Sequence, residues 1–306
     1  FYFLVFVTFL FLVVLIINLR ERRLKRVNLI LEKKVDKRTS ELNKEKIKVE
    51  KQNNEITKSI NYAKRIQYSI LPEDALLKEF FKEHFVLYQP KDIVGGDFFW
   101  YRCFGKISVI ATVDCTGHGV PGGFMSMMGS LLLDKIIQLD NLNTSKILQD
   151  LHKEITRVLN QSSGGEIQDG MDIAICIIDK EKSKLHFSGA RNGIMILSGE
   201  KLNYLNADIF SVGGSYSNKS KLLKRNFKTH SIDLKSNDWV FMYTDGFYDQ
   251  LGGELVNSMG VDYFKKTLIE SANIEGGKVE FLKNSFNDWK GNLPQIDDVL
   301  VLGFQV

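Results

Sequence analysis

The sequence predicts an α+β fold in which two antiparallel sheets are covered by helices. Three observations point to this class. Of the 306 residues, 44% are hydrophobic and 25% are charged, which is the composition of an ordinary globular protein. Short apolar runs rich in β-branched and aromatic residues follow one another closely, as the strands of antiparallel sheets do. The helical patterns come in pairs, whereas a parallel sheet needs a helix after each strand.

These signals place the elements along the chain. Polar segments bearing glycine or serine, at 162–169 and 206–225, are expected to be mobile loops. The expected strands cover 84–89, 98–104, 107–113, 172–178, 184–189, 193–198, 226–233, 238–244 and 298–305, and the expected helices cover 121–139, 144–161, 260–271 and 276–290.

The first 19 residues predict a transmembrane helix. They contain no charge, and as a helix they span about 28 Å, close to the thickness of a bilayer core. A signal-peptide core is the rival interpretation, but a basic start and a small-residue cleavage site are missing. The basic run RERRLKR follows directly, which indicates the cytoplasmic side of an inner membrane, with the rest of the chain in the cytosol. Because residue 1 is Phe, the chain resembles the C-terminal part of a longer protein.

Residues 20–72 predict a signalling helix that precedes a domain at 73–306. No Gly or Pro occurs from 20 to 70, and an apolar residue recurs every seventh position from Val35 to Ile70. The companion positions are apolar only at the two ends, so we expect a weakened coiled coil that forms a homodimer. A solvated helix that merely spaces the domain from the membrane is the alternative. The companion positions are Leu24, Leu31, Arg38, Glu45, Gln52, Ser59 and Ile66.

Positive charge is concentrated in this helix. Residues 20–58 hold 14 Lys+Arg against 7 Asp+Glu, and the totals of 41 and 37 leave 27 against 30 for the remainder. The predicted domain is therefore not basic, which argues against a nucleic-acid partner. The local excess suits attraction to anionic lipid.

Carboxylates stand where several predicted strands begin or end. Asp97 precedes one strand and Asp114 ends another, Asp245 follows a third, and Asp297 and Asp298 precede the last. Glycines beside the first two permit turns that pass close to a ligand. Oxygen ligands of this kind suit hard ions such as Mg²⁺ or Mn²⁺. Ordinary Asp-Gly turns are the alternative interpretation.

The order of these motifs resembles the SpoIIE/RsbU-type branch of the metal-dependent, protein phosphatase 2C-like (PPM) serine/threonine phosphatases. The resemblance covers about positions 58–306. It is carried by SINYAKRIQYSILP, GGD, DCTGHG, DGMDIAICIID, TDGFYDQ and QIDDVLVLGF.

This resemblance implies an αββα sandwich, two Mn²⁺ or Mg²⁺ ions and hydrolysis by a metal-activated water. The implied catalytic and metal-ligating residues are Asp97, Asp114, Asp245 and Asp297, with the carbonyl of Cys115 as a further ligand and Asp298 as the alternative to Asp297. The implied substrate is a phosphorylated protein, by resemblance a STAS-domain anti-sigma-factor antagonist. No counterpart is found for the phosphate-binding arginine that larger relatives carry near the start of the domain.

The sequence offers two further candidate residues and two alternative functions. His118 is a candidate proton donor, although a turn-stabilising role fits it better. Asp172 is either an additional acid of the site or a residue that caps a strand. A catalytically inactive binding module and a diguanylate-cyclase-like domain are alternative functions, but all the acids are present and Phe98 replaces the acid of a GGDEF turn. The three cysteines show no CxxC spacing, so neither a disulfide frame nor a zinc site is predicted.

Overall fold

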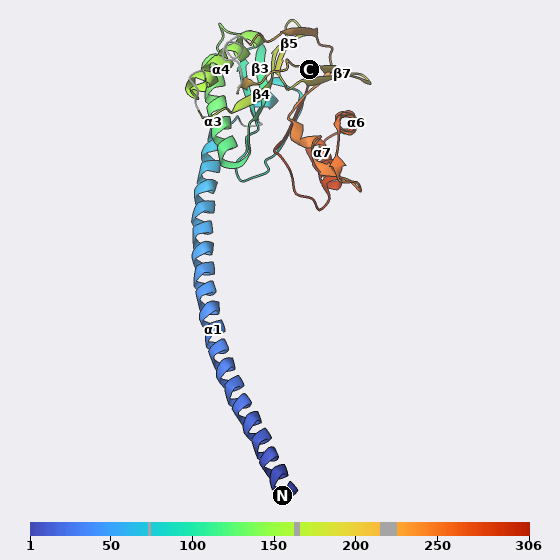
Figure 1. Ribbon diagram of the computed structural model, residues 1–306. Coiled ribbons are helices and arrows are strands. Elements are labelled where there is room, and N and C mark those ends of the chain that lie inside the picture. The colour runs from blue at the N-terminus through green and yellow to red at the C-terminus, as the bar shows by residue number, and fades with distance from the viewer. Residues whose placement is uncertain (73–74, 162–165, 215–224) are drawn as a thin grey trace. The chain divides into compact units, whose positions relative to one another are not determined.

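A computed structural model of the chain describes residues 1–72, 75–161, 166–214 and 225–306 (Figure 1). The chain divides into two units, Phe1–Ser59 and Ile60–Val306. Apart from Phe1, the first unit lies within helix α1 (Tyr2–Ile70), and all of its residues are exposed. By length and composition α1 is able to cross a membrane, and it is the one such helix in the described residues.

The second unit contains two antiparallel sheets. The first sheet has five strands in the order β1-β13-β10-β6-β7. The second sheet has six strands, in the order β2-β3-β4-β5-β9 with β8 paired to β4. The strands of the first sheet are β1 (Glu83–Gln89), β13 (Val299–Gln305), β10 (Trp239–Tyr243), β6 (Ile194–Ser198) and β7 (Lys201–Leu205). Those of the second are β2 (Phe98–Phe104), β3 (Ile107–Cys115), β4 (Gly170–Asp179), β5 (Lys184–Ala190), β8 (Val212–Gly213) and β9 (His230–Asp233).

Helices cover the outer faces of both sheets. The helices on the second sheet are α3 (Gly119–Ile136) and α4 (Thr144–Val158), and those on the first are α6 (Val261–Ala272) and α7 (Lys278–Lys290). The remaining elements are α2 (Ala75–Phe80), the 3₁₀ helix η2 (Asp245–Phe247) and a small hairpin of β11 (Leu251–Gly252) and β12 (Asn257–Ser258).

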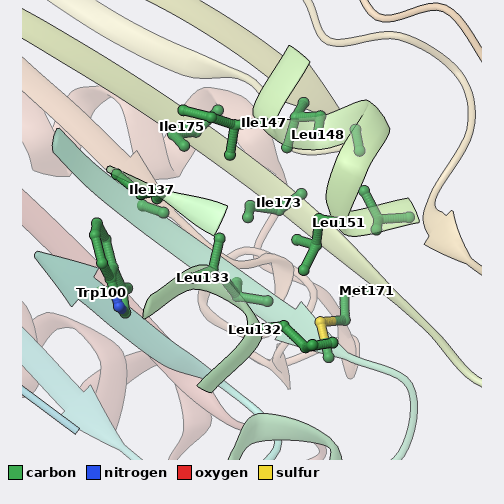
Figure 2. Packing of buried hydrophobic residues seen from close by; sticks show 14 of the residues in the cluster. Trp100, Leu132, Leu133, Ile137, Ile147, Leu148, Leu151, Met171, Ile173 and Ile175 are labelled. Atoms are coloured by element: carbon green, nitrogen blue, oxygen red, sulfur yellow. The ribbon is translucent and has the colours of Figure 1, made fainter. Parts of the chain in front are cut away.

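The side-chain alternation of the central strands builds three hydrophobic cores. Along β4, Ile173 and Ile175 point to the outer core under α3 and α4, whereas Ala174 and Cys176 point to the core between the sheets. Figure 2 shows the outer core. In α4 the apolar residues form one stripe that packs on the sheet, and the Asn143 side chain caps its start by accepting from Lys146 N at 2.9 Å. Helix pair, sheet, sheet and helix pair therefore form the predicted αββα order.

The sequence-based prediction missed elements that are short or weakly patterned. Strand β7 is an edge strand with mostly exposed side chains, so its sequence lacks a clear apolar alternation. Helix α2 has only six residues. The segment 206–225 contains β8, and the rest of that segment is described only in part, as is 162–169. Helix α3 ends at Ile136, earlier than the predicted 139.

Candidate active site

The predicted carboxylates lie at one end of the sandwich. In antiparallel sheets the end of one strand lies beside the start of the next, so the end of β3 meets the starts of β2 and β4. In the first sheet the end of β10 likewise meets the start of β13. A buried hydrogen bond joins these ends across the sheets, because Thr244 Oγ1 donates to Asp97 Oδ2 at 2.6 Å.

Strand alternation turns several of these acids toward the space between the sheets. Val113 and Cys115 belong to the outer core, so Asp114 between them faces inward. Asp172 lies opposite Asp114 in the register of β3 and β4, and residues directly opposite share one face. Asp97 precedes Phe98, another residue of the outer core, and is itself only 3% exposed.

Asp298 organises the GGD turn. Its Oδ2 accepts hydrogen bonds from the backbone N–H groups of Gly96 at 2.6 Å and Asp97 at 3.4 Å, and its Oδ1 accepts from Lys91 N at 2.7 Å. Burial raises the pKa of Asp298, and these backbone donors partly oppose that effect. A carboxylate engaged by three amides fixes the turn that carries Asp97.

Three carboxyl groups of the site, including those of Asp114 and Asp245, have raised pKa values. Burial, and then the charge of Asp245, raises the pKa of Asp114 to about 8. Burial, and then the charge of Asp249, raises the pKa of Asp245 to about 6. The pKa of Asp97 is also raised, by burial and then by Asp114. Mutually repelling, buried carboxylates create a strong preference for a cation.

The donor set fits hard divalent ions. The described residues contain no group of three or more His, Cys, Asp or Glu side chains that converge on one metal position. Mg²⁺ retains several waters and needs only one or two carboxylates from the protein. Carboxylate oxygens that lie near one another at one edge of the sandwich, without converging on one point, therefore suit such an ion. Backbone also approaches closely here, since a Cβ on Gly96 would lie 2.6 Å from the carbonyl of Gly117 and 3.1 Å from that of Cys115.

The thiol of Cys115 points away from the site. It lies in the outer core, where burial raises its pKa well above the usual range. A protonated thiol suits neither Mg²⁺ nor Mn²⁺, which leaves the carbonyl as the only group that Cys115 offers a hard ion.

His118 and Asp172 are held by other side chains. His118 Nδ1 lies 2.6 Å from Asp92 Oδ2 and its Nε2 lies 2.9 Å from Lys91 Nζ, all at the exposed surface. Asp172 is ion-paired with Arg191 through Nε at 3.1 Å. Burial raises the pKa of Asp172, and hydrogen bonding with Ser211 opposes the rise.

Three residues of the site escaped the sequence analysis. Gln67, near the end of α1, is buried and its Nε2 donates to Gly95 O at 2.6 Å and to Ser126 Oγ at 2.7 Å. Thr244 and Arg191 are the others. The only sequence signal for them is their position, since Thr244 directly precedes Asp245 and Gln67 lies within RIQYSILP. Their contacts join residues that are far apart along the chain.

Comparisons with known proteins identify the family. The profile of the family described as Stage II sporulation protein E (SpoIIE) matches residues 106–306, so the chain belongs to the SpoIIE family. The matched region begins after Asp97, later than the predicted position 58. A search of curated proteins found no match.

Solved structures agree with this membership. The SiaA-PP2C domain of Pseudomonas aeruginosa is 28% identical, with a TM-score of 0.75 over 83% of this chain and 98% of that one. The PP2C phosphatase domain of Bacillus subtilis SpoIIE, with a fragment of its regulatory domain, is 17% identical, with a TM-score of 0.58 over 73% of this chain and 63% of that one. The RsbU and RsbW domains of a Mycobacterium tuberculosis protein give 17% identity and a TM-score of 0.56 over 73% and 59%. The last two show the fold alone. The chain thus contains a PPM-type phosphatase domain of the serine/threonine phosphatase class.

Proposed function

We propose that this chain hydrolyses phosphoserine or phosphothreonine on a partner protein, with two Mn²⁺ or Mg²⁺ ions held at the carboxylate end of the sandwich. One observation carries the proposal. Asp97, Asp114 and Asp245 are gathered at this end, and burial together with repulsion by neighbouring carboxylates raises the pKa of each. Within a PPM-type phosphatase domain, such a cluster supports metal-assisted hydrolysis.

The contacts favour different roles for the two adjacent acids near the C-terminus. Both oxygens of Asp298 already accept backbone hydrogen bonds, so we assign it to positioning the GGD turn. Asp297 uses Oδ1 to accept from Asp298 N at 2.8 Å and has Oδ2 left for an ion. The proposed ligands are then Asp97, Asp114, Asp245 and Asp297, with the Cys115 carbonyl.

The residues of the chain prepare the site in three ways. Bound Mn²⁺ or Mg²⁺ supplies charge neutralisation for the phosphoryl group and acidifies water. Thr244 holds one oxygen of Asp97 and so leaves the other for binding an ion. Asp298 fixes the backbone around Asp97, and Gln67 holds the carbonyl of Gly95 on the other side of the turn. A rigid turn keeps the carboxylate in place through turnover.

Phosphate release from a phosphoserine protein tests the proposal. We expect turnover with Mn²⁺ and none in EDTA. Activity that is absent with both Mn²⁺ and Mg²⁺ would favour the catalytically inactive module. Synthesis of cyclic dinucleotides from GTP would support the diguanylate-cyclase alternative, which membership of the SpoIIE family does not favour.

A phosphorylated STAS-domain protein is the proposed substrate. The structural relatives include a protein with RsbU and RsbW domains and a component described with the bacterial stressosome, which suggests partner-switching regulation. Pull-down of a phospho-STAS protein by the full chain, with the unphosphorylated form as the control, tests this assignment. Equal capture of both forms would contradict it.

Membrane anchoring is proposed for residues 1–19. Every side chain in this segment of α1 is exposed, which suits contact with lipid. The basic run after it favours a cytosolic catalytic domain and an anchor in the inner membrane. The full chain should fractionate with membranes, and a chain that begins at residue 20 should not.

The proposed homodimer forms through residues 20–70 of α1. Apolar residues from both heptad rows of α1 are more than half exposed and therefore available for pairing: Leu24, Leu31, Val35, Leu42 and Val49. Polar residues in the companion row weaken one packing register, and a weak seam permits two registers of similar energy. Replacing Arg38, Glu45, Gln52 and Ser59 with Leu should lock one register and make activity constitutive. Normal regulation of that variant, or a monomer with full activity, would show that α1 is only a tether.

A further inference from the structure

Arg191 stands at the carboxylate end of the sandwich. It directly follows Ala190, the last residue of β5. Its Nε lies 3.1 Å from Asp172 Oδ2, and Asp172 lies opposite Asp114 in the β3–β4 register. Burial and neighbouring carboxylates raise the pKa of Asp245, and the positive charge of Arg191 opposes part of that rise. This guanidinium is therefore within electrostatic reach of one proposed metal ligand, Asp245, and is ion-paired with Asp172 beside another.

The backbone at Arg191 is strained. Its φ is +60°, in the left-handed region that non-glycine residues adopt rarely. Asn192 N donates to Ala190 O at 2.7 Å across Arg191, and Arg191 N donates to Asp208 O at 2.8 Å. Asn192 Nδ2 also donates to the backbone carbonyl of Asp172 at 3.3 Å. Strain held by several contacts is typical of residues whose placement serves a function.

The side chain of Arg191 has donors to spare. Arginine carries five N–H donors, and in the described residues the ion pair with Asp172 engages only Nε. The side chain is 60% exposed although its partner Asp172 is 25% exposed. The terminal nitrogens therefore remain available to a ligand that arrives from solvent.

A pocket of about 370 Å³ opens beside this side chain. Its lining includes Arg191, Thr116, Gly170 and Ser211. Thr116 is two residues beyond Asp114, and Gly170 accepts from Thr116 N at 3.0 Å, so the pocket borders the carboxylate cluster. Two other cationic side chains of the described residues already contact protein groups. Lys91 Nζ lies 2.9 Å from His118 Nε2, and Arg225 Nη1 donates to the carbonyls of Ser211 and Gly213.

We propose that Arg191, oriented by Asp172, binds the phosphoryl group of the substrate at the mouth of this pocket. The inference rests on the proposed phosphatase function and names the residue that recognises phosphate. A phosphomonoester is a dianion with several oxygens to satisfy, so a cation on the solvent side adds hydrogen-bond donors to the charge neutralisation that bound Mn²⁺ or Mg²⁺ would supply. The planar guanidinium offers two parallel N–H donors that match two phosphate oxygens.

The test uses the full chain in detergent at saturating Mn²⁺, with inorganic phosphate and p-nitrophenyl phosphate as probes. For Arg191→Gln we expect the inhibition constant of phosphate and the KM of p-nitrophenyl phosphate to rise about 10- to 100-fold, the size of a lost hydrogen-bonded charge pair. The value of kcat should change less than about threefold, as for loss of uniform binding. Arg191→Lys should recover part of the loss. The control Lys184→Ala removes a cation at the opposite end of β5, where it pairs with Asp233, and should change neither constant.

Asp172→Asn tests the orientation by Asp172. It should weaken phosphate binding in the same direction but less, and the double variant with Arg191→Gln should be no worse than Arg191→Gln alone. Additive losses would overturn the positioning role of Asp172. Unchanged phosphate inhibition in Arg191→Gln, or a loss explained by weaker Mn²⁺ binding in a direct titration, would overturn the whole inference.

Calorimetric titration with phosphate separates this inference from the proposed function. Phosphate binding that depends on Arg191 in a chain without turnover would refute the phosphatase and support the recognition site. Normal turnover with binding that ignores Arg191 would refute only the recognition site. A chain that neither binds phosphate nor turns over substrate would refute both.

Discussion

The two ends of the same strands treat acidic residues in opposite ways. At the end away from the site, Asp179 pairs with Lys182 at 3.1 Å and Asp233 pairs with Lys184 at 3.5 Å. The pKa of Asp179 is lowered, chiefly by its hydrogen bond with Lys182. At the site end, burial and repulsion by other acids raise the pKa of Asp114 to about 8. The direction of the pKa shift thus separates the lysine-paired Asp179 at the far end from the clustered acids at the site end.

This difference has an energetic consequence for the protein without metal. A buried carboxylate beside other carboxylates destabilises the folded state, whereas a carboxylate with its own ammonium group does not. The three hydrophobic cores, which lie on either side of the two sheets and between them, offset this destabilisation of the folded state. The site end should therefore gain stability when divalent ions bind it.

The largest expected effect follows from Asp114→Asn. The change removes the charge of a proposed ligand with almost no change in volume, so phosphatase activity with Mn²⁺ should be abolished. The matched change at the other end, Asp179→Asn, should leave kcat and KM near their wild-type values. Phosphate release at saturating Mn²⁺ measures both. A near-normal rate for Asp114→Asn would refute the assignment of this ligand.

The same two variants should shift stability in opposite directions in EDTA. A carboxyl whose folded-state pKa is raised contributes stability that is fully present below its unfolded pKa, near 4, and is lost as the pH rises through the folded value. Asparagine mimics the neutral form, so Asp114→Asn should melt like wild type at pH 4 and higher at pH 8.5, by at least about 2–4 °C. Asp179 has a lowered pKa and contributes stability above its unfolded pKa. Asp179→Asn should therefore melt lower at neutral pH.

Gln67→Leu is expected to have an intermediate effect. The variant removes both hydrogen bonds of a buried side chain that holds the Gly95 carbonyl and Ser126, although Ser126 Oγ still donates to Gly95 O at 3.2 Å. Loss of groups that orient a metal site typically costs about 10- to 100-fold in metal affinity or activity. We expect a loss of that size in kcat/KM, with weaker Mn²⁺ binding. Ser69→Leu, an exposed position nearby on α1, is the control, and an equal loss there would point to a general effect on the helix.

The strands and acids that were predicted correctly in position share one local signal in the sequence, a continuous apolar run. Residues 173–178 of strand β4 are buried on both faces and form an uninterrupted apolar run, so the start of the strand was predicted within two residues. The acids stand directly at the ends of such runs. Edge strand β7 lacks this signal because few of its side chains are buried.

Roles that depend on tertiary contacts were not predictable in this way. Asp297 and Asp298 are adjacent and chemically identical, and only the contacts of Asp298 with Gly96 and Lys91, about 200 residues earlier, distinguish them. The same holds for Arg191, whose relevance follows from the register that puts Asp172 opposite Asp114. Long-range pairing carries that information, and local periodicity does not.

The smallest expected effect is that of His118→Ala. This variant tests whether the active site includes the exposed residue His118. His118 lies between the side chains of Asp92 and Lys91 at the surface, so removing the ring leaves both charges in water at little cost. A surface turn residue should cost less than about tenfold in kcat, whereas general acids contribute about 10²- to 10⁴-fold. Measuring kcat with p-nitrophenyl phosphate and with a phosphoserine peptide sharpens the test, because p-nitrophenolate leaves without needing a proton. A loss above 10²-fold with the peptide alone, at unchanged circular dichroism, would make His118 the proton donor to the serine oxygen and extend the active site beyond the carboxylates.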